Sequence, residues 1–97
     1  MMNNIKNLHK SEQAVSAQLF FRGSEGAVRA LQLQQNALLK EHITQTAALL
    51  LCVVGEVVYE DEQNRQYRLQ SGDYVAIEPL VKHWVSGVVD SQLLLIK

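Results

Sequence analysis

The chain has 97 residues, with 9 lysine and arginine residues against 10 aspartate and glutamate residues and a formal net charge of −1 at pH 7. A chain of this length has room for one small core, so we expect a single domain over residues 1–97, with residues 1–10 mobile as terminal segments often are. The sequence contains no basic block, no apolar signal segment and no apolar run long enough to span a bilayer, so we expect a cytoplasmic protein that binds neither nucleic acid nor membrane.

The first informative segment, residues 27–42, fits two different structures. Val28, Leu31, Leu38 and His42 fall at helical spacing among good helix-forming residues. Residues 28–34 also alternate between two faces, as in a strand, and Asn36 tolerates the left-handed backbone of a turn. The residues themselves leave a helix and a pair of strands equally supported.

The next segment, from Ala47 to Val54, is a run of eight apolar residues closed by Gly55. Its length and its lack of alternation predict a strand that is buried on both faces. Cys52 lies inside this run and is expected to pack in the core as a small hydrophobic residue. Because one face of a strand cannot use so many apolar residues, we expect the surplus to be covered, and we predict a homodimer.

The rest of the chain reads as a series of short strands. Residues 56–60 and 66–69 alternate on either side of the polar segment 61–65, which predicts a hairpin. A turn at Ser71-Gly72-Asp73 leads into residues 74–77, and Pro79 then interrupts pairing. Residues 83–85 and 93–96 complete the series. Short strands at such regular spacing favour a β-sandwich or a β-barrel.

The spacing of residues 36–55 resembles the first of the two signature motifs of the cupin superfamily. That motif runs from a glycine through five residues to His-x-His, then to a glutamate and a closing glycine. Here Asn36 takes the place of the first glycine, His42 matches the first histidine and Gly55 matches the closing glycine. Two positions differ, because Thr44 replaces the second histidine and Ala48 replaces the glutamate.

The second cupin motif is matched in the same incomplete way. It runs from a glycine through a proline, a second glycine and a histidine to an asparagine. Gly72 and His83 match, Pro79 lies one residue late, Leu80 replaces the second glycine, and Gly87 stands in place of the asparagine. The resemblance implies an all-β fold, an antiparallel double-stranded β-helix or jelly-roll barrel, and therefore strands rather than a helix over residues 27–42.

The resemblance also implies a site inside the barrel. Cupins hold a divalent metal with three histidines and a glutamate, and of these ligands only His42 and His83 are present. They imply a divalent transition metal such as zinc, iron, nickel or manganese, although a stable metal site usually needs three or four ligands. The alternative is a barrel without metal in which both histidines are polar groups of a pocket. We expect the ligand pocket to be lined by His42, Thr44, Tyr59 and His83.

Three functions follow from this site. The first is a binding module that accepts a small organic ligand beside His42 and His83, with no reaction assigned. The second is a metal-dependent enzyme of the oxygenase, isomerase or decarboxylase type, which the resemblance allows. The third is an interaction protein that acts through an apolar outer face as a homodimer. A metal-free variant of the enzyme reading would pair a histidine base with a tyrosine acid, as in sugar epimerases that share the fold.

Overall fold

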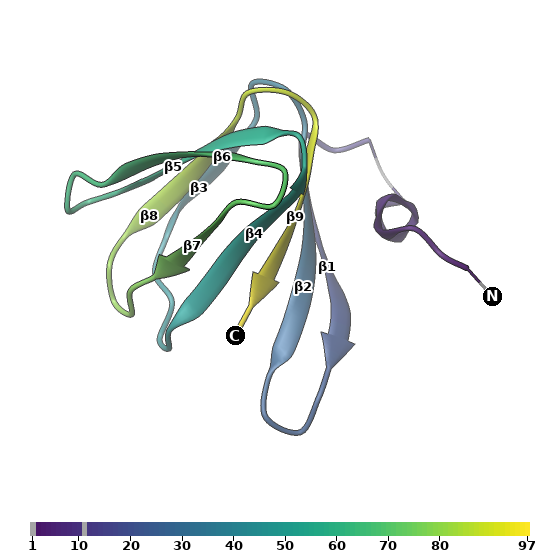
Figure 1. The fold of residues 1–97 in the computed structure, drawn as a ribbon, viewed down its shortest axis with the longest axis horizontal. Coiled ribbons are helices and arrows are strands. Elements are labelled where there is room, and N and C mark those ends of the chain that lie inside the picture. The colour runs from purple at the N-terminus through teal and green to yellow at the C-terminus, as the bar shows by residue number, and fades with distance from the viewer. Residues whose placement is uncertain (1, 11) are drawn as a thin grey trace.

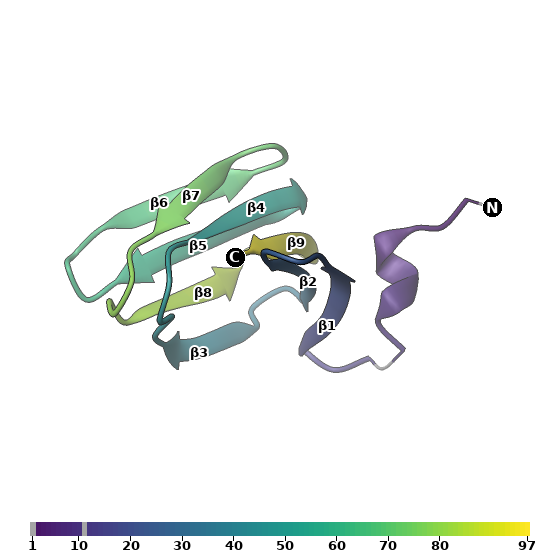
Figure 2. The same ribbon diagram turned by 90° about the horizontal axis from the view of Figure 1, so that it is seen from below.

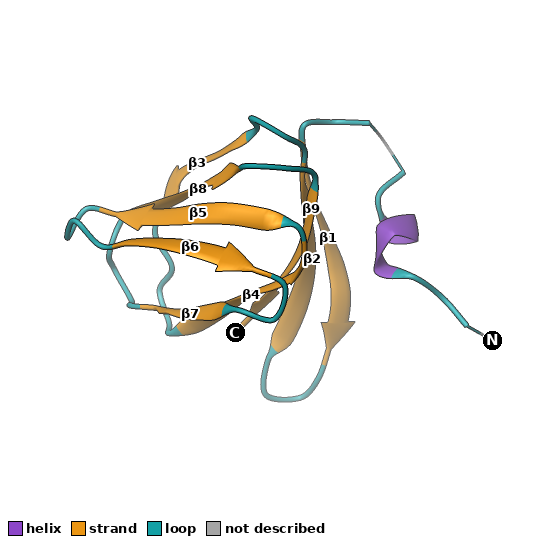
Figure 3. Cartoon of the chain, turned by 45° about the horizontal axis from the view of Figure 1, so that its top comes forward, coloured by secondary structure: helices purple, strands orange, loops and turns teal. Residues whose placement is uncertain are grey.

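The computed structural model describes residues 2–10 and 12–97, and almost all of the regular structure in them is β (Figures 1 and 3). Within these residues a single 3₁₀ turn, η1, precedes nine strands. The elements are η1 (Ile5–Leu8), β1 (Val15–Arg22), β2 (Ala27–Leu33), β3 (Leu38–His42), β4 (Ala48–Val54), β5 (Glu56–Asp61), β6 (Gln66–Gln70), β7 (Tyr74–Ile77), β8 (His83–Gly87) and β9 (Ser91–Ile96). No helix in this part of the chain is long and apolar enough to cross a membrane.

The strands form two antiparallel sheets that face each other across one core. The larger sheet has the order β1-β2-β9-β4-β7, and the smaller has the order β3-β8-β5-β6. Figure 2 shows the two sheets as the walls of a barrel, with η1 lying beyond β1 and away from the smaller sheet. This arrangement confirms the predicted all-β jelly-roll fold. Its core contains Leu31, Leu33, Ala48, Leu50, Cys52, Val57, Tyr59, Leu69, Ile77, Val85, Leu93 and Leu95.

Residues 27–42, where helix and strands were equally supported, form β2 and β3. Asn36 lies in the turn between them with a positive φ of 67°, a conformation that asparagine adopts more readily than most residues. The backbone N–H of Asn36 donates to the carbonyl of Gly87 at 2.9 Å. β2 is hydrogen-bonded to β1 on one side and to β9 on the other. Pairing with distant strands therefore decides a segment that local propensity leaves open.

β4 corrects one expectation. The apolar run was predicted to be buried on both faces, but only its inward residues Ala48, Leu50 and Cys52 are buried. Leu49 and Val53 point outward and are each 38% exposed. The reason is that the four-stranded sheet covers the inner face of the five-stranded sheet, whereas no strand of the described chain covers the outer face of β4.

The polar segment between β5 and β6 is a tight turn, as predicted. Asn64 adopts a positive φ of 63°, and the backbone N–H of Asn64 donates to the carbonyl of Asp61.

At the N-terminus, His9 Nδ1 lies 2.8 Å from the hydroxyl of Ser16 on β1. The mobility expected for residues 1–10 stays a prediction.

Candidate functional site

His42 and His83, the two histidines matched to the cupin motifs, meet inside the barrel. They lie on the paired strands β3 and β8, directly opposite each other in the register. Their Nε2 atoms are 3.0 Å apart, and the ring centroids are 4.2 Å apart in an edge-on arrangement. His83 is buried, and His42 is partly exposed. Strand pairing thus brings together two side chains that are 41 residues apart in sequence.

The contacts of the Nδ1 atoms determine the tautomers of the two neutral rings. His42 Nδ1 lies 3.2 Å from the carbonyl of Lys40, and His83 Nδ1 lies 3.1 Å from the carbonyl of Val81. A carbonyl only accepts hydrogen bonds, so each Nδ1 carries the hydrogen. In the neutral rings both Nε2 atoms then present a lone pair, and the two lone pairs face each other. A metal ion that accepts both lone pairs would stabilise this arrangement.

The ring of His83 is buried beside aromatic rings. The ring of Tyr59 stacks on His83 with centroids 5.8 Å apart, and Tyr67 stacks on the far side of Tyr59 at 6.1 Å. Burial lowers the pKa of His83, and the charge of His42 lowers it further, whereas the hydrogen bond to the carbonyl of Val81 and the charge of Asp61 oppose the shift. The site therefore favours neutral His83.

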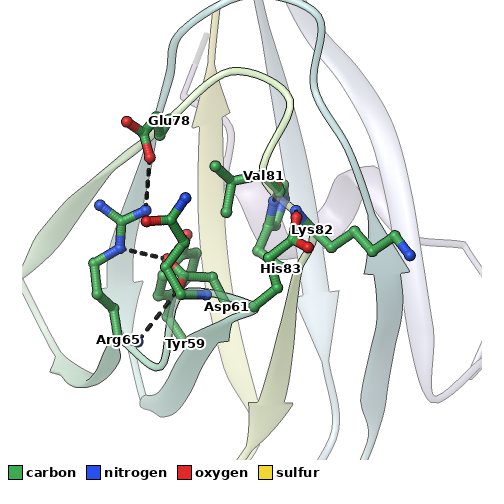
Figure 4. Close-up of polar contacts among 9 residues, drawn as sticks. Tyr59, Asp61, Arg65, Glu78, Val81, Lys82 and His83 are labelled. Carbon is green, nitrogen blue, oxygen red and sulfur yellow. Dashed lines mark hydrogen bonds and ion pairs between the residues drawn. The ribbon is translucent and has the colours of Figure 1, made fainter.

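An ion-pair cluster joins the β5–β6 turn to the loop that leads into β8. Arg65 Nε donates to Asp61 at 2.8 Å, and Arg65 Nη2 donates to Glu78 at 2.8 Å (Figure 4). Beside it, the backbone N–H of Lys82 donates to the carboxylate of Glu62. Because β8 begins at His83, these contacts hold the loop before β8 and so position His83 in the lumen.

Asp61 is the centre of this cluster, and its side chain is fully buried. Its carboxylate accepts hydrogen bonds from the backbone N–H groups of Gln63 and Arg65, from the guanidinium of Arg65 and from the hydroxyl of Tyr59. Burial alone would raise the pKa of Asp61, but these hydrogen bonds outweigh it and hold the pKa below its ordinary value. Burial and the nearby carboxylate of Asp61 raise the pKa of Tyr59 to about 12.

The lumen beside the histidines is almost filled. Its cavity has a volume of about 10 Å³, which is room for one water molecule or one ion. Both histidines line it together with aliphatic side chains. The lining residues are Leu31, Leu39, His42, Leu50, Ile77, His83, Val85 and Leu95.

A much larger groove opens next to this cavity, between β3 and the β1–β2 hairpin. Its volume is about 710 Å³, within the range typical of small-molecule sites. His42, Leu31, Leu39 and Leu95 line both the groove and the cavity, so the groove leads directly to the histidine pair. The groove is lined by Ala14, Val15, Ala17, Arg29, Leu31, Leu38, Leu39, Lys40, Glu41, His42 and Leu95.

The four residues predicted to line one pocket are not all together. His42 and His83 share the small cavity. Tyr59 lines a different groove of about 560 Å³ that includes residues of β6 and β7. Thr44 follows the end of β3 and lines neither of these spaces. It is buried, and its hydroxyl has no hydrogen-bond partner among residues 2–10 and 12–97.

The side chains around the histidine pair supply only part of the ligand set of a metal ion. Two imidazole nitrogens 3.0 Å apart suit a divalent transition metal. No group of three or more metal-ligating side chains gathers within the described part of the chain, and the nearby carboxylate of Asp61 is already engaged by Arg65, Tyr59 and two backbone amides. The site fits attachment of an ion at two points, with the remaining positions left to water or a ligand, and it is not a closed protein cage.

Sequence reasoning missed Arg29 and Asp61. Asp61 was part of the polar turn segment, although an aspartate before a turn is a known acceptor for backbone N–H groups. Arg29 is an arginine in an alternating strand, on the face that carries Leu31 and Leu33. If residues 28–34 form a strand, the sequence already places the charge of Arg29 on the same face as Leu31 and Leu33.

Known proteins resemble this chain in structure rather than in sequence. No family profile matches it. No curated protein is significantly similar to it. An RmlC-like cupin from Desulfovibrio desulfuricans is 13% identical, with a TM-score of 0.83 over 99% of this chain and 92% of the other.

Two further solved structures are similar to this chain over most of its length. A cupin superfamily protein from Desulfitobacterium hafniense is 15% identical, with a TM-score of 0.82 over 96% of this chain and 84% of the other. KdgF from a Halomonas species is 16% identical, with a TM-score of 0.77 over 91% of this chain and 81% of the other. The arrangement of the two sheets and these neighbours agree: the chain has the cupin fold.

Proposed function

We propose that the protein binds a small organic molecule in the groove between β3 and the β1–β2 hairpin, beside His42 and His83. The observation that supports this proposal is the groove of about 710 Å³, which is lined mainly by aliphatic side chains and reaches the histidine pair through His42. Ligand sites of this size typically combine an apolar wall with a few polar groups that orient the ligand. No reaction is assigned to the site.

The experiment is a small-molecule screen in which binding is mapped by NMR on the full chain. Ala17 is exposed and lines the groove, and it lies directly opposite Leu31 in the β1–β2 register. Ala17→Trp fills the groove without removing a core side chain. Gln18→Trp adds the same ring to the next residue, which faces the other side of the strand. Binding that is lost in Ala17→Trp and kept in Gln18→Trp supports the proposal. Binding that is equal in both variants contradicts it.

A second candidate is a metal-dependent function, and one observation favours it. Both Nδ1 atoms lie within hydrogen-bond distance of carbonyls, which leaves the Nε2 atoms of His42 and His83, 3.0 Å apart, as two neighbouring ligand atoms. We propose that these two atoms hold a divalent transition metal such as zinc, iron, nickel or manganese. The metal would supply a Lewis acid beside the groove. The residues of the chain would hold it and exclude water from its inner side.

Elemental analysis of protein purified without a metal-chelating tag tests this candidate. The matched variants are His42→Ala, His83→Ala and His9→Ala, because His9 lies outside the barrel and contacts Ser16. Stoichiometric metal in the wild type and in His9→Ala, with loss in the other two, supports the site. A wild type that binds added zinc or nickel no better than the His42 and His83 variants contradicts it.

A third proposal concerns assembly. The outward residues of β4 and β9 form an apolar surface, in which Leu49 pairs with Ile96 and Leu51 pairs with Leu94. The neighbouring outward residues on β2 and β7, Val28 and Tyr74, extend this surface, and none of these six side chains is charged. An uncharged apolar patch can pack against its own copy around a twofold axis. We propose that two copies form a homodimer through this surface.

Light scattering after size exclusion tests the homodimer. The wild type is expected at twice the 10.9 kDa chain mass, and Leu49→Arg is expected at the monomer mass because it buries a charge in the interface. Val89→Arg, at an exposed loop position away from this surface, is expected to remain dimeric. A monomeric wild type rules out this assembly.

A further inference from the structure

Arg29 interrupts the apolar inner face of the five-stranded sheet. It lies directly opposite Leu95 on β9, and Leu95 lies opposite Leu50 on β4. Directly opposed residues project from the same face of a sheet. Leu50 and Leu95 both line the cavity beside the two histidines. Arg29 therefore belongs to the same inward row, at the point where this row reaches the groove.

The guanidinium of Arg29 is not neutralised by the protein. Within residues 2–10 and 12–97, the arginines in ion pairs are Arg65 and Arg68, and no carboxylate lies within 4.0 Å of Arg29. Arg29 is exposed and lines the groove. Guanidinium groups bind carboxylates with two parallel hydrogen bonds, so this side chain presents an unused anion-binding group at the edge of an apolar surface.

The other two charged groups of the groove cancel each other and leave the positive charge of Arg29 in excess. Lys40 and Glu41 are its remaining charged residues, so the lining carries two positive charges and one negative charge. The rest of the lining is aliphatic apart from His42. The second groove, between β6 and β7, differs because both of its arginines are held in ion pairs with Asp61, Glu78 or Glu56. Of these two grooves, the one that adjoins the histidines therefore carries the unpaired arginine.

We propose that the ligand of this groove is an amphipathic carboxylate, with its carboxylate on Arg29 and its apolar body along Leu31, Leu39 and Leu95. This inference rests on the proposed binding function of the groove and adds the chemical class of the ligand. Arg29 acts as the anchor of the charged head. The aliphatic wall excludes water from the body of the ligand, as burial of apolar area requires.

Isothermal titration with three probes of equal chain length tests the inference: octanoate, octanol and octylamine. Octanoate is expected to bind more tightly than octanol, and octylamine is expected to bind least. Arg29→Gln is expected to weaken octanoate about tenfold, the effect of one charge-assisted contact, and to leave octanol unchanged. Arg68→Gln removes the same charge from another part of the surface and is expected to leave octanoate binding unchanged.

Two results would overturn the inference and leave the binding function intact. These are equal affinities for octanoate and octanol, and equal effects of Arg29→Gln and Arg68→Gln. If octanoate binds equally well to Ala17→Trp, the groove is not its site, and the proposed binding function fails together with the inference. Binding of octanoate that is sensitive to both Ala17→Trp and Arg29→Gln, and insensitive to Gln18→Trp, supports both.

Discussion

The Nε2 atoms of His42 and His83 face each other at 3.0 Å, while both Nδ1 atoms lie within hydrogen-bond distance of main-chain carbonyls. The contacts of the Nδ1 atoms decide whether a hydrogen can lie between the two Nε2 atoms. If either Nδ1 were free, one ring could donate from Nε2 to the other as a neutral pair. Because both Nδ1 atoms donate to carbonyls, the pair lacks a hydrogen between the rings and attracts a cation instead.

The first prediction is that both rings are Nδ1–H tautomers when neutral. Long-range ¹H–¹⁵N correlation spectra at pH 8, recorded on protein treated with chelator, distinguish the two tautomers of each ring. His9 is the internal comparison, because its Nδ1 lies near the hydroxyl of Ser16, a group that both donates and accepts and so imposes no tautomer. An Nε2–H tautomer in His42 or in His83 would show that the carbonyl contacts do not control the pair.

The second prediction concerns acid stability and Asp61. The pKa of Asp61 is below its ordinary value in the folded state. Its charged form therefore stabilises the fold above the unfolded pKa of about 3.9, and this contribution is lost as the pH falls through the lower folded pKa. Asp61→Asn should cost about 2 kcal/mol at pH 7, because an amide nitrogen that cannot accept replaces one of the two oxygens to which the buried donors bind. It should also flatten the fall in stability below about pH 4.

Urea unfolding of both proteins between pH 3 and pH 7 measures this effect. Glu78→Gln is the control, because Glu78 is the exposed partner of Arg65, and exposed ion pairs contribute little. A pH profile of Asp61→Asn that is parallel to that of the wild type would remove Asp61 from the acid response.

The third prediction compares two glycines with positive φ. Gly55 has φ of 107° and Gly72 has φ of 91°, so an alanine is strained at either position. A Cβ at Gly55 would also collide with the side chain and backbone of Ser91 and with the carbonyl of Asp90, whereas a Cβ at Gly72 meets nothing within 4 Å. Gly72→Ala should cost about 1 kcal/mol, and Gly55→Ala about 3 kcal/mol or more. Thermal unfolding measures both, and equal losses would mean that the crowding at Gly55 relaxes freely.

The fourth prediction is that Cys52 does not react in the folded protein. It is completely buried on β4. Burial raises the pKa of the thiol, and the charges of Asp73 and Glu56 raise it further, so the reactive thiolate is disfavoured. A thiol reagent should label Cys52 only as fast as the protein opens. Val53→Cys in a Cys52→Ala background places a thiol on the outward face of the same strand and should react quickly. Fast labelling of wild-type Cys52 would contradict its place in the core.

Much of this fold follows from short-range features of the sequence. The β5–β6 turn, the turn at Gly72 and the end of β4 at Gly55 depend on the backbone preferences of a few adjacent residues, and these preferences act whatever the rest of the chain does. The spacing that resembles the two cupin motifs predicted that His42 and His83 share a site, and the structure brings these two residues together.

Long-range pairing decided the rest. Residues 27–42 have both helical and strand character, and they form strands because β1, β8 and β9 supply the hydrogen bonds of their backbones. The apolar run of β4 resembles a strand buried on both faces, yet its outer face is exposed because burial depends on which elements pack there. The absence of Thr44 and Tyr59 from the lining of the histidine cavity and the place of Arg29 beside the groove also depend on contacts between distant segments. Local sequence determines where the chain turns and alternates, and only the packing of the two sheets determines which side chains share a space.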